Sequence, residues 1–175
     1  MNEGLYAKIM AAVPILRPLT RPELDEIVAI SRLLKVGREA TVIREGEIGN
    51  SMYIIVSGRV RVLKEVRAGE QKTLATLGAG EVFGEMALID RYPRSASVVT
   101  LTNTVLYQLD LDRFNSLRDA WRPAAFKVLR QLAPVLCRRI RSMDRMTGEM
   151  LAARPEKDTP EVRRELMDRL KGGEA

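Results

Sequence analysis

Residues 80–98 read Gly-Glu-Val-Phe-Gly-Glu-Met-Ala-Leu-Ile-Asp-Arg-Tyr-Pro-Arg-Ser-Ala-Ser-Val. Gly80 and Gly84 mark positions where the backbone can adopt positive φ or approach another group closely. The run from Glu85 to Leu88 has helix-forming composition, whereas Pro93 prevents a helix from continuing through the end of the stretch. The sequence therefore predicts one short helical turn, whose free N–H groups favour an anion.

The residues after the proline add a cation and small side chains. Arg94 is followed by Ser95 and Ala96, which leave their own amides accessible. A planar guanidinium, several amides and a hydroxyl together form a cradle for a phosphate group. A phosphate would repel the carboxylate of Glu85 unless that carboxylate faced another part of the ligand, and an acceptor-only group suits a sugar hydroxyl.

This stretch resembles the phosphate-binding cassette of the cyclic nucleotide-binding domain family. The family pattern is Phe-Gly-Glu, an apolar residue, Ala-Leu, a variable loop, and then Arg followed by small residues and Val. This chain matches the pattern with residues 83–88 and residues 94–98. The separation between Glu85 and Arg94 is one found in nucleotide-binding members. Family members that lose the ligand commonly lose the Glu or the Arg, and this chain has both.

The resemblance implies a role for each cassette residue. Glu85 and the Gly84 backbone would hold the ribose 2′-hydroxyl, while Arg94, Ser95 and nearby amides would hold the cyclic phosphate. Two strand residues outside the cassette are also expected to reach the ligand. The full set of expected ligand contacts is Phe83, Gly84, Glu85, Met86, Ala87, Leu88, Arg94, Ser95, Ala96, Val62 and Leu74.

The residue after the cassette arginine bears on the identity of the ligand. In the family this position is often Thr in members that prefer cGMP, and here it is Ser95. The resemblance therefore favours cAMP over cGMP, with no metal. The residue that contacts the base is expected from the long C-terminal helix, where Ser142 and Arg138 are candidates.

Composition narrows the function classes. A chain of 175 residues with 46% hydrophobic content forms one domain with a core and at most an appendage. Histidine is absent and Cys137 is the single cysteine, which excludes imidazole catalysis and argues against a zinc site, so we expect no enzyme. There is no signal-peptide pattern and no apolar run of about 20 residues, so we expect a cytoplasmic protein without a membrane partner.

The region before the cassette predicts helices and then strands. Residues 1–32 predict a helical bundle, with a short amphipathic helix over Leu5 to Val13 and a second helix that begins at a Thr20–Glu23 capping box. From Leu33 the hydrophobic period changes to two, and short alternating runs separated by glycines and polar turns continue to Asp110.

Many short strands without intervening helices predict an antiparallel β-barrel or jelly roll over residues 33–110. The fold class is then α+β, mainly β, with N-terminal helices and a long C-terminal helix. Residues 44–60 form a second stretch that is similar to the family, in which glycines make tight turns. Asn50 stands where the family usually has Asp, and Asn tolerates the same turn geometry.

Residues 111–150 predict two C-terminal helices, the first capped by Asp110 and the second beginning near Pro123. The second helix carries an apolar seam at alternating spacings of three and four: Phe126, Leu129, Ala133, Leu136, Ile140, Met143, Thr147 and Met150. Bacterial members of the family dimerise through the equivalent helix, so the resemblance implies a homodimer through residues 124–150. Pro134 is expected to bend this helix near Arg130 or to break it.

The last part, residues 151–175, predicts a linker and a short amphipathic helix over residues 159–171. Transcription factors of the family carry a helix-turn-helix domain after the long helix, and the roughly 25 residues after Met150 are too few for one. The resemblance therefore implies a stand-alone receptor that acts on an unknown downstream protein. The alternatives are a ligand-independent protein-interaction module and a DNA-associated regulator. The net charge of +6 fits a basic surface better than a nucleic-acid footprint.

Overall fold

The structure is a computed structural model, and it describes residues 12–67, 69–90, 92–152 and 164. The chain divides into two compact units, residues 1–133 and residues 134–175. The helix expected over residues 5–13 lies almost wholly outside the described residues, and so does the helix expected over residues 159–171. Among the helices in the described part of the chain, none has both the length and the apolar character needed to cross a membrane.

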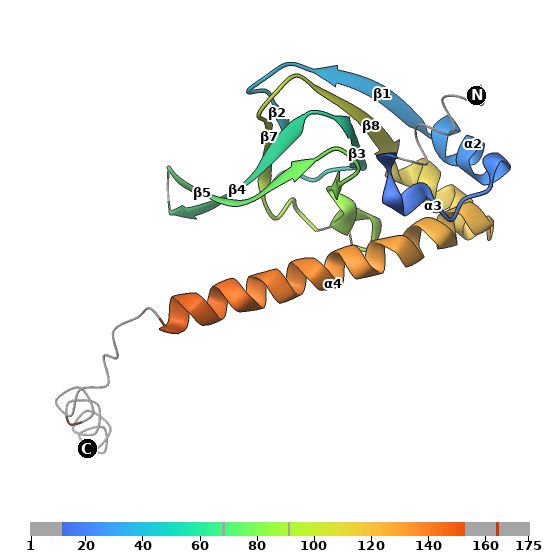
Figure 1. Ribbon diagram of the computed structural model, residues 1–175. Helices are drawn as coiled ribbons and strands as arrows, with labels where there is room; N and C mark the ends of the chain where they lie inside the picture. The colour runs from blue at the N-terminus through green and yellow to red at the C-terminus, as the bar shows by residue number, and fades with distance from the viewer. Residues whose placement is uncertain (1–11, 68, 91, 153–163, 165–175) are drawn as a thin grey trace. The chain divides into compact units, whose positions relative to one another are not determined.

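The first unit is built mainly of short strands with helices before and after them (Figure 1). The helical elements are η1 (Pro14–Leu16), α2 (Arg21–Ala29), η2 (Glu85–Leu88), α3 (Leu111–Asp119) and α4 (Pro123–Ala152). The strands are β1 (Ser31–Val36), β2 (Thr41–Ile43), β3 (Ser51–Ser57), β4 (Arg59–Arg67), β5 (Glu70–Gly78), β6 (Val82–Phe83), β7 (Ser97–Thr100) and β8 (Thr104–Asp110).

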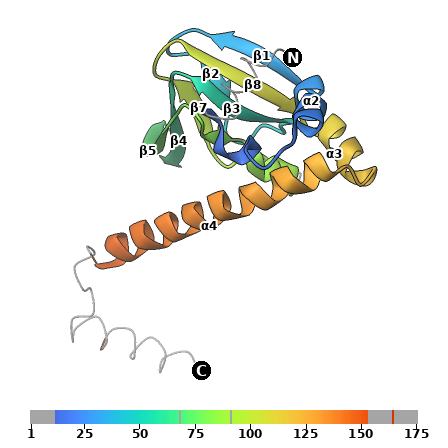
Figure 2. The ribbon, with the colours of Figure 1, turned by 45° about the vertical axis from the view of Figure 1, so that its right-hand side comes forward.

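The strands form two four-stranded antiparallel sheets, with the orders β1-β8-β3-β6 and β2-β7-β4-β5. Figure 2 shows these sheets as the two layers of a sandwich. Consecutive strands often lie in different sheets, as with β1 and β2 or β6 and β7, and this crossing between layers is typical of a jelly roll. The predicted α+β, mainly β class is therefore confirmed, in its jelly-roll form rather than as a closed barrel.

Strand alternation shows that both faces of β3 in the first sheet are buried. Tyr53 and Ile55 of β3 belong to the cluster between the sheets, so Met52 and Ile54 must point to the opposite face. Met52 and Ile54 are also fully buried. Figures 1 and 2 show α2 and α3 beside the ends of β1 and β8, where they help to cover that face. The cluster between the sheets is Ile43, Tyr53, Ile55, Val60, Leu77, Phe83, Val98 and Leu106.

The helices begin where the sequence predicts. At α2 the Glu23 carboxylate accepts a hydrogen bond from the Thr20 backbone N–H at 2.7 Å, as part of a capping box. At α3 the Asp110 carboxylate accepts from the Arg113 backbone N–H at 3.0 Å. Each bond satisfies a first-turn or cap N–H that has no partner within the helix. Both predicted starts are therefore confirmed.

Phe114 of α3 has a fully buried side chain, so replacing it tests how much this helix contributes to the core. We expect Phe114→Ala to lower the free energy of unfolding by about 3–5 kcal/mol, since it removes a buried ring and leaves a cavity. Phe126→Ala in α4 is the control, because Phe126 is 39% exposed and stacks on Trp121. Phe126→Ala should lower the free energy of unfolding by about 1 kcal/mol. Urea denaturation measures both values, and equal losses would contradict this account of the core.

Helix α4 begins at Pro123 and includes Pro134 in its interior. The predicted start is confirmed. Of the two effects expected of Pro134, a bend or a break, the break is wrong, because the helix is continuous to Ala152. Pro134 has no N–H to donate to the Arg130 carbonyl, so the helix continues past it without that hydrogen bond. In the first unit the buried face of α4 consists of Ala124, Ala125, Val128 and Leu132.

Trp121 lies at the corner between α3 and α4. Its φ is 54°, a left-handed conformation that costs a bulky residue free energy, and its side chain is 79% exposed. The indole ring stacks on Phe126 with ring centroids 5.4 Å apart. This stacking holds an aromatic pair on the surface at the point where the chain turns into its longest helix.

Candidate functional site

The cassette begins in β6, the edge strand of its sheet, and continues into the short helix η2. β6 pairs with β3, and the ring of Phe83 stacks on that of Tyr53 with centroids 4.9 Å apart. Gly84 then adopts φ 73°, and η2 follows as a four-residue 3₁₀ helix over Glu85–Leu88. The left-handed φ explains the glycine, since larger residues resist that conformation. The single predicted helical turn is confirmed.

Arg94 is held on the protein backbone from several sides. Its Nη1 donates to the Gly84 carbonyl at 3.1 Å, and its Nη2 donates to the Ser51 carbonyl at 2.5 Å. Its own backbone N–H donates to the Glu47 carbonyl at 2.9 Å, and its carbonyl accepts from the Gly46 N–H at 2.9 Å. The two backbone bonds fix the main chain at Arg94, and the two side-chain bonds place the guanidinium between Ser51, at the start of β3, and Gly84, just before η2. We call this position the arginine seat.

Two glycines make room for the arginine seat. A Cβ on Gly49 would lie 2.0 Å from Arg94 Nε, a distance that real Cβ contacts do not reach. A Cβ on Gly84 would lie 2.9 Å from Arg94 Nη1 and 3.1 Å from the Ser51 carbonyl oxygen. Gly49 was predicted only as part of a turn. The structure shows that Arg94 occupies the space that a side chain at Gly49 would fill.

The charge of Glu85 acts on the Arg94 guanidinium. Glu85 is 2% exposed, and Arg94 is partly buried. Burial lowers the pKa of the Arg94 guanidinium below its ordinary value, while the charges of Tyr53 and Glu85 act in the opposite direction. The structure therefore brings the carboxylate and the guanidinium of the cassette into one electrostatic environment, with the carboxylate nearly removed from water.

The other predicted contacts differ in their surroundings. Leu88 is buried, Ala87 and Ala96 are partly buried, and Met86 is 48% exposed. The Ser95 hydroxyl lies 3.9 Å from the Met86 sulfur, which joins the two ends of the cassette.

The two strand residues also differ. Val62 of β4 packs against the cluster between the sheets, so it faces the interior of the jelly roll. Leu74 of β5 is 39% exposed and lies next to a register shift, and it is Ala75 that packs against the cluster.

Lys64 and Glu45 are two charged residues near the cassette that the sequence reading missed. Lys64 Nζ donates to the Ser95 carbonyl at 2.9 Å and forms an ion pair with Glu45. The Glu45 carboxylate also accepts from the Glu65 backbone N–H at 3.0 Å, and the hydrogen bond from Lys64 lowers the pKa of Glu45. The alternation of side chains along β4 could have predicted this position, since it places Lys64 on the same face as Val62, which was expected to contact the ligand.

Comparison with known proteins identifies the family. The family model for the cyclic nucleotide-binding domain matches residues 33–120. The cyclic AMP receptor protein of Thermus thermophilus is 32% identical over 135 residues, which cover 77% of this chain and 61% of that protein. The cAMP-dependent protein kinase regulatory subunit of Dictyostelium discoideum is 32% identical over 116 residues, covering 65% of this chain and 36% of that protein. The chain thus spans less than two thirds of the length of these relatives.

Solved structures agree with the family match. The crystal structure of a cyclic nucleotide-binding domain from Methylobacillus flagellatus superposes with a TM-score of 0.74 at 27% identity. This similarity covers 83% of the present chain and 84% of that one, so it extends beyond the cassette to the whole jelly roll. The sequence match to the family model and the shared architecture lead to the same conclusion: this chain belongs to the cyclic nucleotide-binding domain family.

Proposed function

We propose that the chain is a regulatory module that binds a cyclic mononucleotide at the cassette, with a preference for cAMP over cGMP. The observation that carries this proposal is the arginine seat, which fixes Arg94 near a buried Glu85. A guanidinium offers more N–H donors than two carbonyls can use, so donors remain for phosphate oxygens. The seat thus pre-organises a cation in a partly buried place, where its interaction with a phosphate is stronger than in water.

The remaining contacts follow from the chemistry of the ligand. Glu85 is an acceptor that suits the ribose 2′-hydroxyl, and Ser95 and the N–H groups at the start of η2 suit the phosphate oxygens. Phe83, Met86, Leu88, Val62 and Leu74 supply apolar surface around the sugar and base. The preference for cAMP rests on Ser95 and on the two relatives whose names refer to cyclic AMP. No catalytic step is needed for this role.

The proposed output is a rearrangement of the helices after Asp110 in a cytoplasmic homodimer. Phosphate capture would draw the cassette inward and allow α3 and α4 to repack. A ligand can bias such an equilibrium only through its different affinities for the two packings. The seam residues Phe126, Ile140 and Met143 are 39%, 58% and 64% exposed, which leaves apolar surface for a second copy through residues 124–150. An unknown downstream protein would respond to this rearrangement of the helices.

A thermal unfolding experiment with nucleotides tests the proposal. A ligand that binds only the native state at about 100 times its Kd adds about 2.7 kcal/mol of stability, so cAMP should raise the unfolding midpoint. Cyclic GMP should raise it less, and 5′-AMP, which lacks the cyclic phosphodiester, is the control that should leave it nearly unchanged. Equal midpoints with and without either cyclic nucleotide would favour the ligand-independent interaction module instead.

A further inference from the structure

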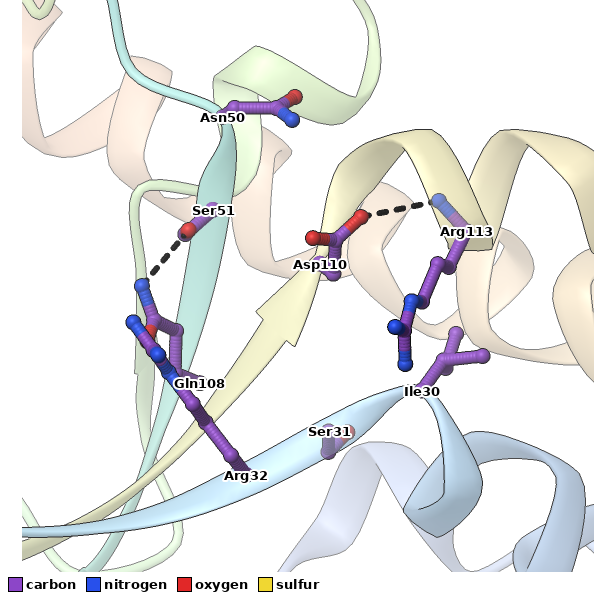
Figure 3. Close-up of a pocket in the computed structure, with 8 residues that line it drawn as sticks. All are labelled: Ile30, Ser31, Arg32, Asn50, Ser51, Gln108, Asp110 and Arg113. Carbon is purple, nitrogen blue, oxygen red and sulfur yellow. Dashed lines mark hydrogen bonds between the residues drawn. The ribbon is translucent and has the colours of Figure 1, made fainter.

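A polar cavity of about 320 Å³ opens where β1, β3 and β8 meet the first turn of α3 (Figure 3). The residues that line it come from the first unit, between residues 30 and 113, and none belongs to the cassette. Ser51 links it to the arginine seat, because its hydroxyl lines the cavity while its carbonyl accepts the hydrogen bond from Arg94. The volume is at the lower end of the range for sites that bind small molecules.

Two arginines contribute to the wall of this cavity. Arg32 uses its Nε to donate to the Gln108 side chain at 2.5 Å, which leaves its two terminal amino groups available. Arg113 donates to Asp110 through its backbone N–H, and its guanidinium makes no hydrogen bond or ion pair with the residues that the structure describes. Figure 3 shows the Arg113 side chain reaching across the cavity toward Ile30. The N–H donors therefore outnumber the acceptors in this wall.

A hydrogen-bond network orients Arg32. The Gln108 Nε2 donates to the Ser51 hydroxyl at 2.8 Å and to the Tyr53 hydroxyl at 3.1 Å. Because both amide hydrogens are used in this way, the Gln108 carbonyl oxygen must face Arg32 and fix its guanidinium. A cation held by its neighbours loses less conformational freedom when an anion binds than a free surface arginine does.

We propose that this cavity binds the phosphate group of a small metabolite through Arg32 and Arg113. Guanidinium groups match phosphate oxygens with paired N–H donors, and two of them balance the charge of a phosphate monoester better than that of a single carboxylate. Asp110 is the only carboxylate among the lining residues, and one of its oxygens already accepts the Arg113 N–H. Its other oxygen suits a hydroxyl donor on the same metabolite. This site uses no cassette residue, so it stands independently of cyclic nucleotide binding.

Inorganic phosphate is the probe, titrated into the full chain at constant ionic strength with chloride as the replaced anion. Calorimetry measures its affinity for the wild type and for Arg32→Gln, Arg113→Gln, Arg61→Gln and Arg94→Gln. Arg61 is the matched control, since it is exposed on β4 and its loss removes the same charge. We expect the affinity to fall about tenfold in each of the first two variants, because each loses charge-assisted hydrogen bonds. Arg61→Gln should bind phosphate like the wild type, and Arg94→Gln should keep the binding that depends on Arg32 and Arg113.

Three results would overturn the site: no phosphate binding by the wild type, unchanged binding in both Arg32→Gln and Arg113→Gln, or loss in Arg94→Gln alone, which would assign the phosphate to the cassette. Urea denaturation without phosphate checks that the variants fold. Arg113→Lys, which keeps the charge and loses the planar fork, is a second variant and should retain part of the affinity. Arg113→Gln should bind cAMP as the wild type does, so failure of this site and failure of the cassette give different results.

Discussion

Replacement of Arg94 by alanine is expected to lower the affinity for cyclic nucleotide by about 100-fold or more, because removing one partner of a desolvated, hydrogen-bonded charge pair typically costs about 2–5 kcal/mol. The phosphate would lose its cation, and the Ser51 and Gly84 carbonyls would lose the donors that they have in the structure. Calorimetric titration with cAMP measures the effect. The affinity of Arg94→Lys for cAMP should lie between those of the wild type and Arg94→Ala. One ammonium group cannot bind both carbonyls and the phosphate in the way that a planar guanidinium does.

Arg61→Ala is the matched control for this prediction, because it removes an exposed arginine from β4. It should change the affinity little beyond a salt-dependent effect of net charge. Retained binding in Arg94→Ala would show that the cassette has been assigned wrongly. A parallel loss in Arg61→Ala would show that binding depends on overall charge rather than on the arginine seat.

Gly49→Ala is expected to weaken cyclic nucleotide binding by about tenfold or more although Arg94 is still present, because the guanidinium loses the position that fixes its hydrogen bonds. The added Cβ would lie 2.0 Å from Arg94 Nε and 2.3 Å from its Cζ. A flexible arginine moves more easily than the backbone of a tight turn, so Arg94 should leave the carbonyls of Ser51 and Gly84. Stability without ligand should change little, whereas the affinity measured by calorimetry should fall.

Gly37→Ala provides the comparison, since an added Cβ at Gly37 would meet nothing within 4 Å and its φ is not in the left-handed region. It should bind cyclic nucleotide like the wild type. The double variant Gly49→Ala with Arg94→Ala should bind no more weakly than Arg94→Ala alone, because both changes act on one interaction. Wild-type affinity in Gly49→Ala would mean that the bound state does not use the arginine seat.

Much of the architecture could be predicted from residue patterns. The glycines and polar turns separate the strands, and the alternation of β7 and β8 reports which of their side chains face the interior. β3 shows the limit of this signal, because Met52 to Ile55 are all buried and its alternation is hidden. β6 has two residues, which is too short for any period to appear.

The sequence predicts which side chains belong to the candidate site, but it does not predict the backbone groups that hold them. Glu85 and Arg94 carry chemistry that their residue types reveal. The Ser51 carbonyl that holds Arg94 leaves no such trace, since every residue has a carbonyl and the two positions are far apart in the chain. Gly49 is similar: a glycine in a polar stretch predicts a turn, and only the folded chain shows which side chain fills the space beside it.

The corner between α3 and α4 carries the single tryptophan of the chain, Trp121, largely in contact with solvent and stacked on Phe126. Indole fluorescence from this protein therefore comes from one known place, with no background from the jelly roll. A change in emission wavelength or in quenching by iodide reads the environment of that corner directly. The natural chain is thus its own optical probe for the helices that follow the cassette, and needs no attached dye.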